Sequence, residues 1–252
     1  MRFVSCLSFI ILPIISVTVI AAEKLTFYTE SFPPFNFKNQ QGELTGASVD
    51  LLKAVLKEGS YQQSEYEINH VNWTRAYNIA LHMPGSVVFS AARVDQREPF
   101  FYWVGPITDS PGAIFIKSSR TLDPNKANSY QYSAIKDDAS VSRLLSLGVP
   151  IANIHYSYDF KNMVSQVKNN RTDGFAYGFY AGSWLLKQSG FKLNEFRVFK
   201  KLISRKVYFA MNLQTDIEAK NRFKSAFESF IKKNPDFIKE RIHYYLQCAP
   251  DC

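Results

Sequence analysis

The sequence is poor in the residues that most reactive sites require. Its 252 residues include 3 cysteines and 4 histidines, and it has no Cys-x-x-Cys pair of the kind that redox proteins use. The histidines, at positions 70, 82, 155 and 243, lie too far apart to match the ligand spacing of a metal site. No Ser/His/Asp or Cys/His arrangement typical of nucleophilic catalysis is evident. We therefore expect no metal ion, no cofactor and no catalytic residues.

Long hydrophobic runs are equally scarce. One charge-free run extends from Phe3 to Ala22, follows the basic Arg2 and ends in small residues, a pattern typical of a secretory signal peptide. About 20 apolar residues are also enough for an uncleaved membrane anchor. Pro13 within the run and the alanines at its end favour cleavage. We predict a cleaved signal peptide over residues 1–22 and an exported mature chain.

Concentrated charge is also missing. The chain has 30 basic and 22 acidic residues, and its basic pairs at 200–201 and 232–233 belong to no longer basic run. A nucleic-acid-binding protein would favour a basic stripe, so we expect no nucleic acid partner. Cys248 and Cys252 form an even pair in an exported chain, which favours a disulfide. Two free thiols spaced i, i+4 on a helix are the alternative.

What the chain does contain is an alternation of strand and helix patterns. In the first half, strands are predicted at 24–30, 66–72 and 86–92, and helices at 47–59 and 73–83. In the second half, strands are predicted at 112–119, 132–136, 151–157, 173–179 and 205–212, and helices at 139–148, 159–170 and 181–190. A helical tail over 216–247 is broken at Asn234-Pro235. The order predicts two α/β lobes with open, mostly parallel sheets.

Three loops of the first lobe hold the candidate binding residues. Ligands of open α/β sheets bind beyond the carboxyl ends of the strands, which selects the loops 30–37, 72–75 and 90–97. Arginine offers a planar fork that binds a carboxylate through two hydrogen bonds, and aromatic walls strengthen that contact by excluding water. Side chains able to form such a site are Glu30, Phe32, Phe35, Trp73, Arg75, Arg93 and Arg97. This set suits a small anion with an apolar or ring-shaped body.

The motifs together resemble the type II periplasmic solute-binding proteins, family 3, the amino-acid-type substrate-binding proteins of ABC transporters. The resemblance is carried by "YTESFPPFNF", "GELTGASVDLLKAVL", "VNWTRAYNIAL", "VVFSAARVDQREPFFYWVGPI" and "LGVPIANIHYSYDFKNMVSQVKNNRTDGFAY" in this order. It implies an α/β, two-lobed fold in which each lobe is an open mixed sheet covered by helices and two hinge strands join the lobes. Lobe one would comprise 23–109 plus 207–252, and lobe two 110–206.

The resemblance also assigns roles to individual residues. Arg97 matches the arginine that binds the ligand's carboxylate, Glu30 matches a polar position of the first loop, and Asp138 matches a contact from lobe two. Two departures weaken the match to an amino-acid site. Ala92 stands where a hydroxyl residue is usual, and Gly178, beside Tyr177, stands where amino-acid binders often place the acid that holds the ammonium.

Each candidate also has a structural interpretation. Arg97 could form a salt bridge with Glu98 or Asp95, and Arg93 could lie outside the cleft. Asp138 suits the N-cap of its helix whatever else it does. Aromatic side chains near strand ends are often core residues, which applies to Phe32, Trp73 and Tyr177, and Arg75 could be a solvated neighbour of a helix cap.

Three functions compete. The first is a non-catalytic, monomeric periplasmic receptor that captures a small polar or anionic solute by hinge closure and delivers it to an inner-membrane ABC permease. The second is a receptor whose closed form docks on a membrane sensor protein instead. The third is a dehydratase-like or lyase-like enzyme on the same fold, for which Glu30 is the one evident acid or base in the pocket.

Overall fold

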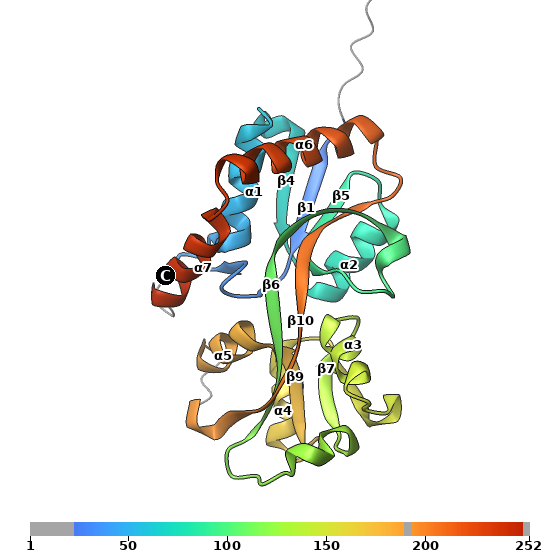
Figure 1. The fold of residues 1–252 in the computed structure, drawn as a ribbon, viewed down its shortest axis with the longest axis vertical. Coiled ribbons are helices and arrows are strands. Elements are labelled where there is room, and N and C mark those ends of the chain that lie inside the picture. The colour runs from blue at the N-terminus through green and yellow to red at the C-terminus, as the bar shows by residue number, and fades with distance from the viewer. Residues whose placement is uncertain (1–22, 189–192, 249–252) are drawn as a thin grey trace, which may run out of the picture.

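The computed structural model describes residues 23–188 and 193–248. The predicted signal peptide and Cys252 lie outside these residues, so both the leader and the Cys248–Cys252 disulfide stay predictions. Two groups of helices and strands lie one above the other in Figure 1, and two long strands run through both. Among the described residues, no helix combines the length and the apolar character needed to cross a membrane.

The main sheet has eight strands in the order β4-β1-β5-β10-β6-β9-β7-β8. Parallel pairing joins β1 to β4 and β5 at one end and β7 to β8 and β9 at the other, while β10 pairs antiparallel with β5 and β6. The strands are β1 (Leu25–Thr29), β4 (Tyr66–His70), β5 (Ser86–Ala92), β6 (Phe101–Lys117), β7 (Tyr132–Ile135), β8 (Ile154–Ser157), β9 (Gly174–Gly178) and β10 (Phe196–Asn212). A separate two-stranded ribbon consists of β2 (Phe37–Lys38) and β3 (Leu44–Thr45).

Helices cover each group of strands. Lobe one comprises β1, β4, β5 and four helices, and lobe two comprises β7, β8, β9 and three helices (Figure 1). The helices of lobe one are α1 (Ala47–Glu58), α2 (Trp73–His82), α6 (Ile217–Lys233) and α7 (Phe237–Cys248), and those of lobe two are α3 (Ala139–Ser146), α4 (Phe160–Lys168) and α5 (Phe179–Gln188). Short 3-10 helices cover Gln63–Glu65, Glu98–Phe100, Pro124–Ser129, Ile151–Asn153 and Leu193–Glu195.

Periodic apolar residues produce these helices, as the sequence indicates. The buried face of α1 carries Val49, Leu52 and Val55, and it packs in one core with Phe223 of α6 and Phe27 of β1. Five phenylalanines belong to that core, and the ring centroids of Phe27 and Phe223 lie 5.2 Å apart. The tail helices α6 and α7 therefore pack on lobe one, where burial of their apolar faces stabilises them.

The long strands β6 and β10 extend beyond the prediction, which placed strands at 112–119 and 205–212 and, from the resemblance, crossing strands near 106–113 and 204–208. Each strand has 17 residues, and they pair along most of their length. The alternation of apolar and polar residues is broken by Gly105-Pro106 in β6 and by Lys200-Lys201 in β10. The sequence pattern therefore does not indicate that each strand is continuous. Predicted lobe boundaries at Asp109 and Val207 fall inside these strands, in neighbouring register positions. The point at which the lobes divide stays a prediction.

Candidate functional site

The candidate site lies where the loops of the two lobes face each other. In lobe one, Glu30 follows β1 directly, Trp73 follows β4 and begins α2, and Arg97 follows β5. In lobe two, Asp137 and Asp138 connect β7 to α3. Because β1, β4 and β5 are parallel, their carboxyl ends meet at one edge of the sheet, and that edge faces lobe two.

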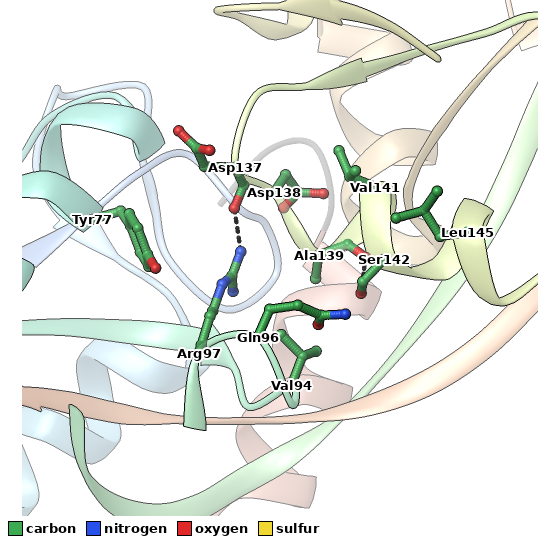
Figure 2. A pocket seen from close by; sticks show the side chains of 10 residues that line it. All are labelled: Tyr77, Val94, Gln96, Arg97, Asp137, Asp138, Ala139, Val141, Ser142 and Leu145. Atoms are coloured by element: carbon green, nitrogen blue, oxygen red, sulfur yellow. Dashed lines mark hydrogen bonds between the residues drawn. The ribbon is translucent and has the colours of Figure 1, made fainter. Parts of the chain in front are cut away.

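Arg97 is the central cation of this site. It is only 6% exposed, and it forms no ion pair in the part of the chain that the structure describes. Its Nη1 donates to the carbonyl of Ala92 at 3.0 Å, and its Nη2 donates to the carbonyl of Asp137 (Figure 2). A guanidinium has five N–H donors, so donors remain for a ligand. The alternative of a salt bridge with Glu98 is not realised, because Glu98 pairs with Arg93.

Aromatic rings shield this guanidinium. The Cζ atom of Arg97 lies 4.9 Å from the ring centroid of Trp73 and 5.3 Å from that of Tyr77. Burial lowers the pKa of Arg97, and nearby Asp138 is the largest opposing influence. An arginine nevertheless keeps its charge in proteins, so the site presents a fixed, poorly hydrated cation.

A single carbonyl of lobe two accepts two hydrogen bonds from lobe one. The indole Nε1 of Trp73 donates to the carbonyl of Asp137 at 2.9 Å, the same oxygen that Arg97 binds. Asp137 presents this oxygen from a left-handed backbone conformation, with φ of 62°. The lobes are thus in contact across the cleft through hydrogen bonds, and Trp73 is both a wall of the site and a link between lobes.

Two carboxyl groups complete the polar lining. The Oδ1 atom of Asp138 accepts the N–H of Ser140 at 2.7 Å and so caps α3, as the sequence predicts. Glu30 faces the cleft, and burial raises its pKa well above the usual value of 4.5. Repulsion from Asp138 raises that pKa further, while Arg97 acts in the opposite direction. Glu30 therefore resists ionisation more than an ordinary glutamate.

Three cavities follow one another along the cleft. A central cavity of about 20 Å³ is lined by Glu30, Trp73, Arg97 and Asp138 among others. An outer cavity of about 180 Å³ opens beside Arg97 toward Leu145 (Figure 2). A third cavity of about 280 Å³ shares Glu30 and Trp73 with the central one. Its aromatic lining residues are His70, Trp73, Tyr158, Phe160 and Tyr177.

Phe32 and Tyr177 form a second contact between the lobes. The Phe32 ring stacks on Phe35 at 5.2 Å and meets the edge of Tyr177 of lobe two at 5.8 Å. A Cβ atom added at Gly178 would lie 2.7 Å from Cε2 of Phe32. The ring of Phe32 therefore occupies the space beside Gly178, where a larger side chain has no room. Burial raises the pKa of Tyr177 well above 10.0, so its hydroxyl stays protonated.

Six of the eight predicted residues thus come together along the cleft, and two do not. Arg93 is exposed, pairs with Glu98, and lies over the rings of Trp103 and Tyr208 at 5.8 and 5.4 Å. Arg75 is exposed on α2, and only its backbone N–H serves the cap, donating to Oδ1 of Asn72 at 2.9 Å. Neither side chain lines the three cavities of the cleft. Any ligand role for these two arginines stays an untested prediction.

Sequence reasoning missed Arg143, Ser90 and Ser110, which also line the central cavity. Arg143 lies within the predicted helix of lobe two, five positions after Asp138, in a stretch whose other signals are those of an ordinary amphipathic helix. The one local signal was a charged residue between apolar positions of a short helix. Ser90 lies in β5, two residues before its end, and is the first residue of the stretch 90–97 that the prediction selected. A serine in a strand carries no distinguishing pattern.

The fold has well-matched counterparts among solved structures. A histidine kinase sensor domain with similarity to periplasmic binding proteins aligns with 89% of this chain and 96% of its own, with a TM-score of 0.75 and 14% identity. An ancestral arginine-binding protein bound to arginine aligns over 88% and 97%, with a TM-score of 0.72 and 17% identity. The arginine-, lysine-, histidine-binding protein ArtJ from the thermophilic bacterium Geobacillus stearothermophilus aligns with 89% of this chain and 96% of its own, with a TM-score of 0.74 and 15% identity.

These similarities define the class of structure. No family model matches the sequence, and no curated protein matches it either. At 14–17% identity the structural matches establish the fold, which is the two-lobed α/β fold of periplasmic binding proteins that the sequence predicts. The three matched structures are binding proteins and a sensor domain.

Proposed function

We propose that this chain is a periplasmic receptor that binds a small, carboxylate-bearing solute between its lobes and belongs to the amino-acid-type solute-binding proteins. One observation carries the proposal: Arg97 is a buried cation in the cleft, without an ion pair in the described chain and with N–H donors to spare. Buried arginines are normally paired. A ligand carboxylate would supply the missing anion and accept two hydrogen bonds from the guanidinium fork.

Binding acts through closure of the lobes about β6 and β10. A solute that contacts Arg97 of lobe one and Asp138 of lobe two stabilises the closed form over the open one, so the ligand shifts the population toward closure. The contacts of Trp73 and Arg97 with the Asp137 carbonyl support this, because they form only when the lobes meet. The predicted boundaries, 23–109 plus 207–252 and 110–206, would then be the bodies that move.

The chemistry of the related proteins supports an amino-acid-like or simple carboxylic acid ligand. The matched structures include proteins named as binding arginine, lysine and histidine. Space for an acidic side chain at position 178 is absent, since Phe32 fills it. Glu30 lines both the central and the third cavity, where it would meet an ammonium, or donate a hydrogen bond when protonated.

The receiving partner is proposed to be an inner-membrane ABC permease, with the receptor acting as a monomer and without catalysis. A specific observation favours a second partner, a membrane signalling protein: one match is a histidine kinase sensor domain, with a TM-score of 0.75. The two partners require the same closed, ligand-bound form. Binding of the closed protein to a purified permease or to a sensor ectodomain would distinguish them.

The proposal is tested by a thermal-shift screen of the mature chain, residues 23–252. The panel contains amino acids, small carboxylic acids, aromatic acids and uncharged analogues. A ligand at 100 times its dissociation constant adds about 2.7 kcal/mol to the free energy of unfolding, which raises the melting temperature by several degrees. Consumption of any stabilising compound during incubation would instead favour an enzyme.

Arg97→Ala is the decisive variant, and Arg93→Ala is its matched control four positions away. We expect Arg97→Ala to raise the Kd of the solute by about 100-fold or more, because losing a buried, charge-assisted pair of hydrogen bonds costs roughly 3 kcal/mol. Arg93→Ala should leave the Kd unchanged. Equal effects of the two substitutions, or unchanged binding by Arg97→Ala, would contradict the assignment.

A further inference from the structure

A second buried arginine reaches the central cavity from the other lobe. Arg143 of α3 is 3% exposed and forms no ion pair within the described ranges. Its Nη2 donates to the carbonyl of Ser110 at 2.7 Å and its Nε donates to the carbonyl of Ile203 at 3.1 Å. Both carbonyls belong to the long strands, β6 and β10. A Cβ atom at Gly112 would lie 2.6 Å from Cδ of Arg143, so the glycine makes room for this side chain.

Arg97 and Arg143 therefore line one small cavity from opposite lobes. Burial lowers the pKa of Arg143, and the positive charges of Arg205 and Arg97 lower it further against the opposing effect of Asp138. Two buried cations that share a cavity repel each other, and their desolvation is costly unless an anion compensates. Asp138 supplies one negative charge against the two positive ones, and Glu30 resists ionisation, so the lining of this cavity leaves one positive charge uncompensated.

A third, independent feature at the cavity is an unsatisfied hydroxyl. The Oγ atom of Ser90 is buried without a hydrogen-bond partner, and the residue is 8% exposed. Ser90 also holds a left-handed backbone conformation, with φ of 58°, two residues before the end of β5. Buried polar groups are normally hydrogen-bonded, and backbone strain of this kind is concentrated at functional sites. Ser90 thus offers a donor to whatever occupies the cavity.

We propose that Arg97, Arg143 and Ser90 together hold one carboxylate of the solute, so that the ligand's anionic group itself bridges the two lobes. This inference rests on the proposed function and names its ligand class. Arg97 would approach the carboxylate from lobe one, Arg143 from lobe two, and the Ser90 hydroxyl would donate the remaining hydrogen bond. Because Arg143 also binds the carbonyls of Ser110 and Ile203, the anion is linked directly to the hinge strands.

The neighbouring cavity indicates what the rest of the solute is. It has a volume of about 280 Å³ and shares Glu30 and Trp73 with the central cavity. Aromatic rings from both lobes line it, including Trp73, Phe160 and Tyr177. Such walls favour an apolar or ring-bearing body by burying its surface and stacking on it. The ligand class is therefore a ring-bearing carboxylic acid.

The experiment compares acids with their primary amides, which have nearly the same shape but no charge. The probes are benzoate, 3-phenylpropanoate, indole-3-acetate and L-phenylalanine, each paired with its amide, titrated into residues 23–252 by calorimetry and thermal shift. We expect at least one acid to stabilise the wild type and its amide to bind at least about 100-fold more weakly. Stabilisation by none of the acids, or equal binding of acid and amide, would overturn the proposal.

Arg143→Gln tests the second arginine, with Arg171→Gln, an exposed arginine of lobe two, as the matched control. We expect Arg143→Gln to weaken acid binding by about 100-fold and to shrink the preference for acid over amide, whereas Arg171→Gln changes neither. If Arg143 only anchors α3 to the hinge strands, Arg143→Gln lowers the melting temperature of the unliganded protein but leaves the acid's Kd unchanged, which would overturn the proposal.

Ser90→Ala keeps the test decisive should Arg143→Gln fail to fold. It removes one hydroxyl and should weaken acid binding by about 5- to 10-fold, as expected for one hydrogen bond to a charged group. Unchanged affinity for the acid would count against the three-residue site. Stabilisation by uncharged solutes alone would overturn this inference while leaving a solute receptor intact. If no compound of the wider screen stabilises the protein, the proposed function is overturned as well.

Discussion

Two arginines four residues apart along the chain each lie over a tryptophan, and the two pairs have opposite environments. At the outer pair, Arg93 lies over Trp103, is exposed, and is neutralised by Glu98. At the inner pair, Arg97 lies over Trp73, is buried, and binds only backbone carbonyls. An exposed ion pair contributes little to stability because water and salt screen it. The inner arginine therefore has no counter-ion among the described residues, whereas the outer one is paired.

The largest expected effect on stability is at the inner tryptophan. Trp73→Ala removes a side chain that is 4% exposed, together with its hydrogen bond to the carbonyl of Asp137. We expect the free energy of unfolding to fall by about 3–5 kcal/mol, as for other buried aromatic residues. The free energy of unfolding of Trp103→Ala, measured in the same way by chemical denaturation, should fall by less. A loss at Trp103 as large as the loss at Trp73 would contradict this expectation.

The next effect concerns the aromatic contact between the lobes. Gly178→Ala would place a Cβ atom 2.7 Å from the ring of Phe32, which is packed between Phe35 and Tyr177. We expect this crowding to cost about 1–3 kcal/mol of stability in the closed form and to weaken solute binding accordingly. Combining it with Phe32→Ala should recover part of the loss. Strictly additive effects in the double variant would show that the two side chains do not clash.

A smaller effect, dependent on pH, is expected at Glu30. Burial and Asp138 raise its pKa well above 4.5 in the folded chain. At low pH the carboxyl is protonated in both states, so Glu30→Gln and the wild type have the same pH dependence. As the pH rises, the unfolded chain ionises while the folded chain resists, so the wild type loses stability relative to Glu30→Gln. Melting temperatures measured from about pH 4 to pH 7 test this.

Glu67 supplies a control of opposite sign. Its pKa is lowered, chiefly by a hydrogen bond from Lys24. The wild type should therefore gain stability relative to Glu67→Gln as the pH rises through the lowered pKa toward the ordinary one, and keep that gain above it. The same direction of change for both variants would contradict the contrast between a buried cleft and a solvated surface.

The smallest effect is expected at the outer pair. Glu98→Gln breaks the ion pair with Arg93, both of whose side chains are largely exposed. Solute affinity should stay unchanged, and the melting temperature should shift only slightly and less so at high salt. A clear loss of solute binding would mean that Arg93 belongs to the site after all.

Much of the fold was predictable because its signals are local. The helices α1, α2 and α6 follow from apolar residues at helical spacing, and the short strands follow from β-rich stretches between turn residues. The full length of β6 and β10 was not predictable, since Gly105-Pro106 and Lys200-Lys201 interrupt the pattern while partner strands keep the backbone extended. Pairing across 79 or more residues of sequence has no local signature.

The candidate site was predictable in kind but not in membership. Arg93 and Arg97 follow the same strand, and no local property separates them. Arg93 forms an ion pair with the nearby Glu98, whereas Arg97 points into the cleft and binds the carbonyl of Asp137. Arg143 was missed because its position depends on contacts with the carbonyls of Ser110 and Ile203 in the two long strands. These residues lie 33 and 60 positions away from Arg143 along the chain, so no local pattern reveals the contacts.

The amino-acid sequence by itself determined the alternation of strands and helices, the two-lobed class of fold, and the loops at which a charged and aromatic site would form. These depend on periodicity and on strand ends, which are local properties of the chain. Only the tertiary structure decided which arginines are buried, which acids face them, and that a serine hydroxyl is left without a partner. Burial and desolvation arise when segments distant in sequence close around the same small space, and no single segment contains that information.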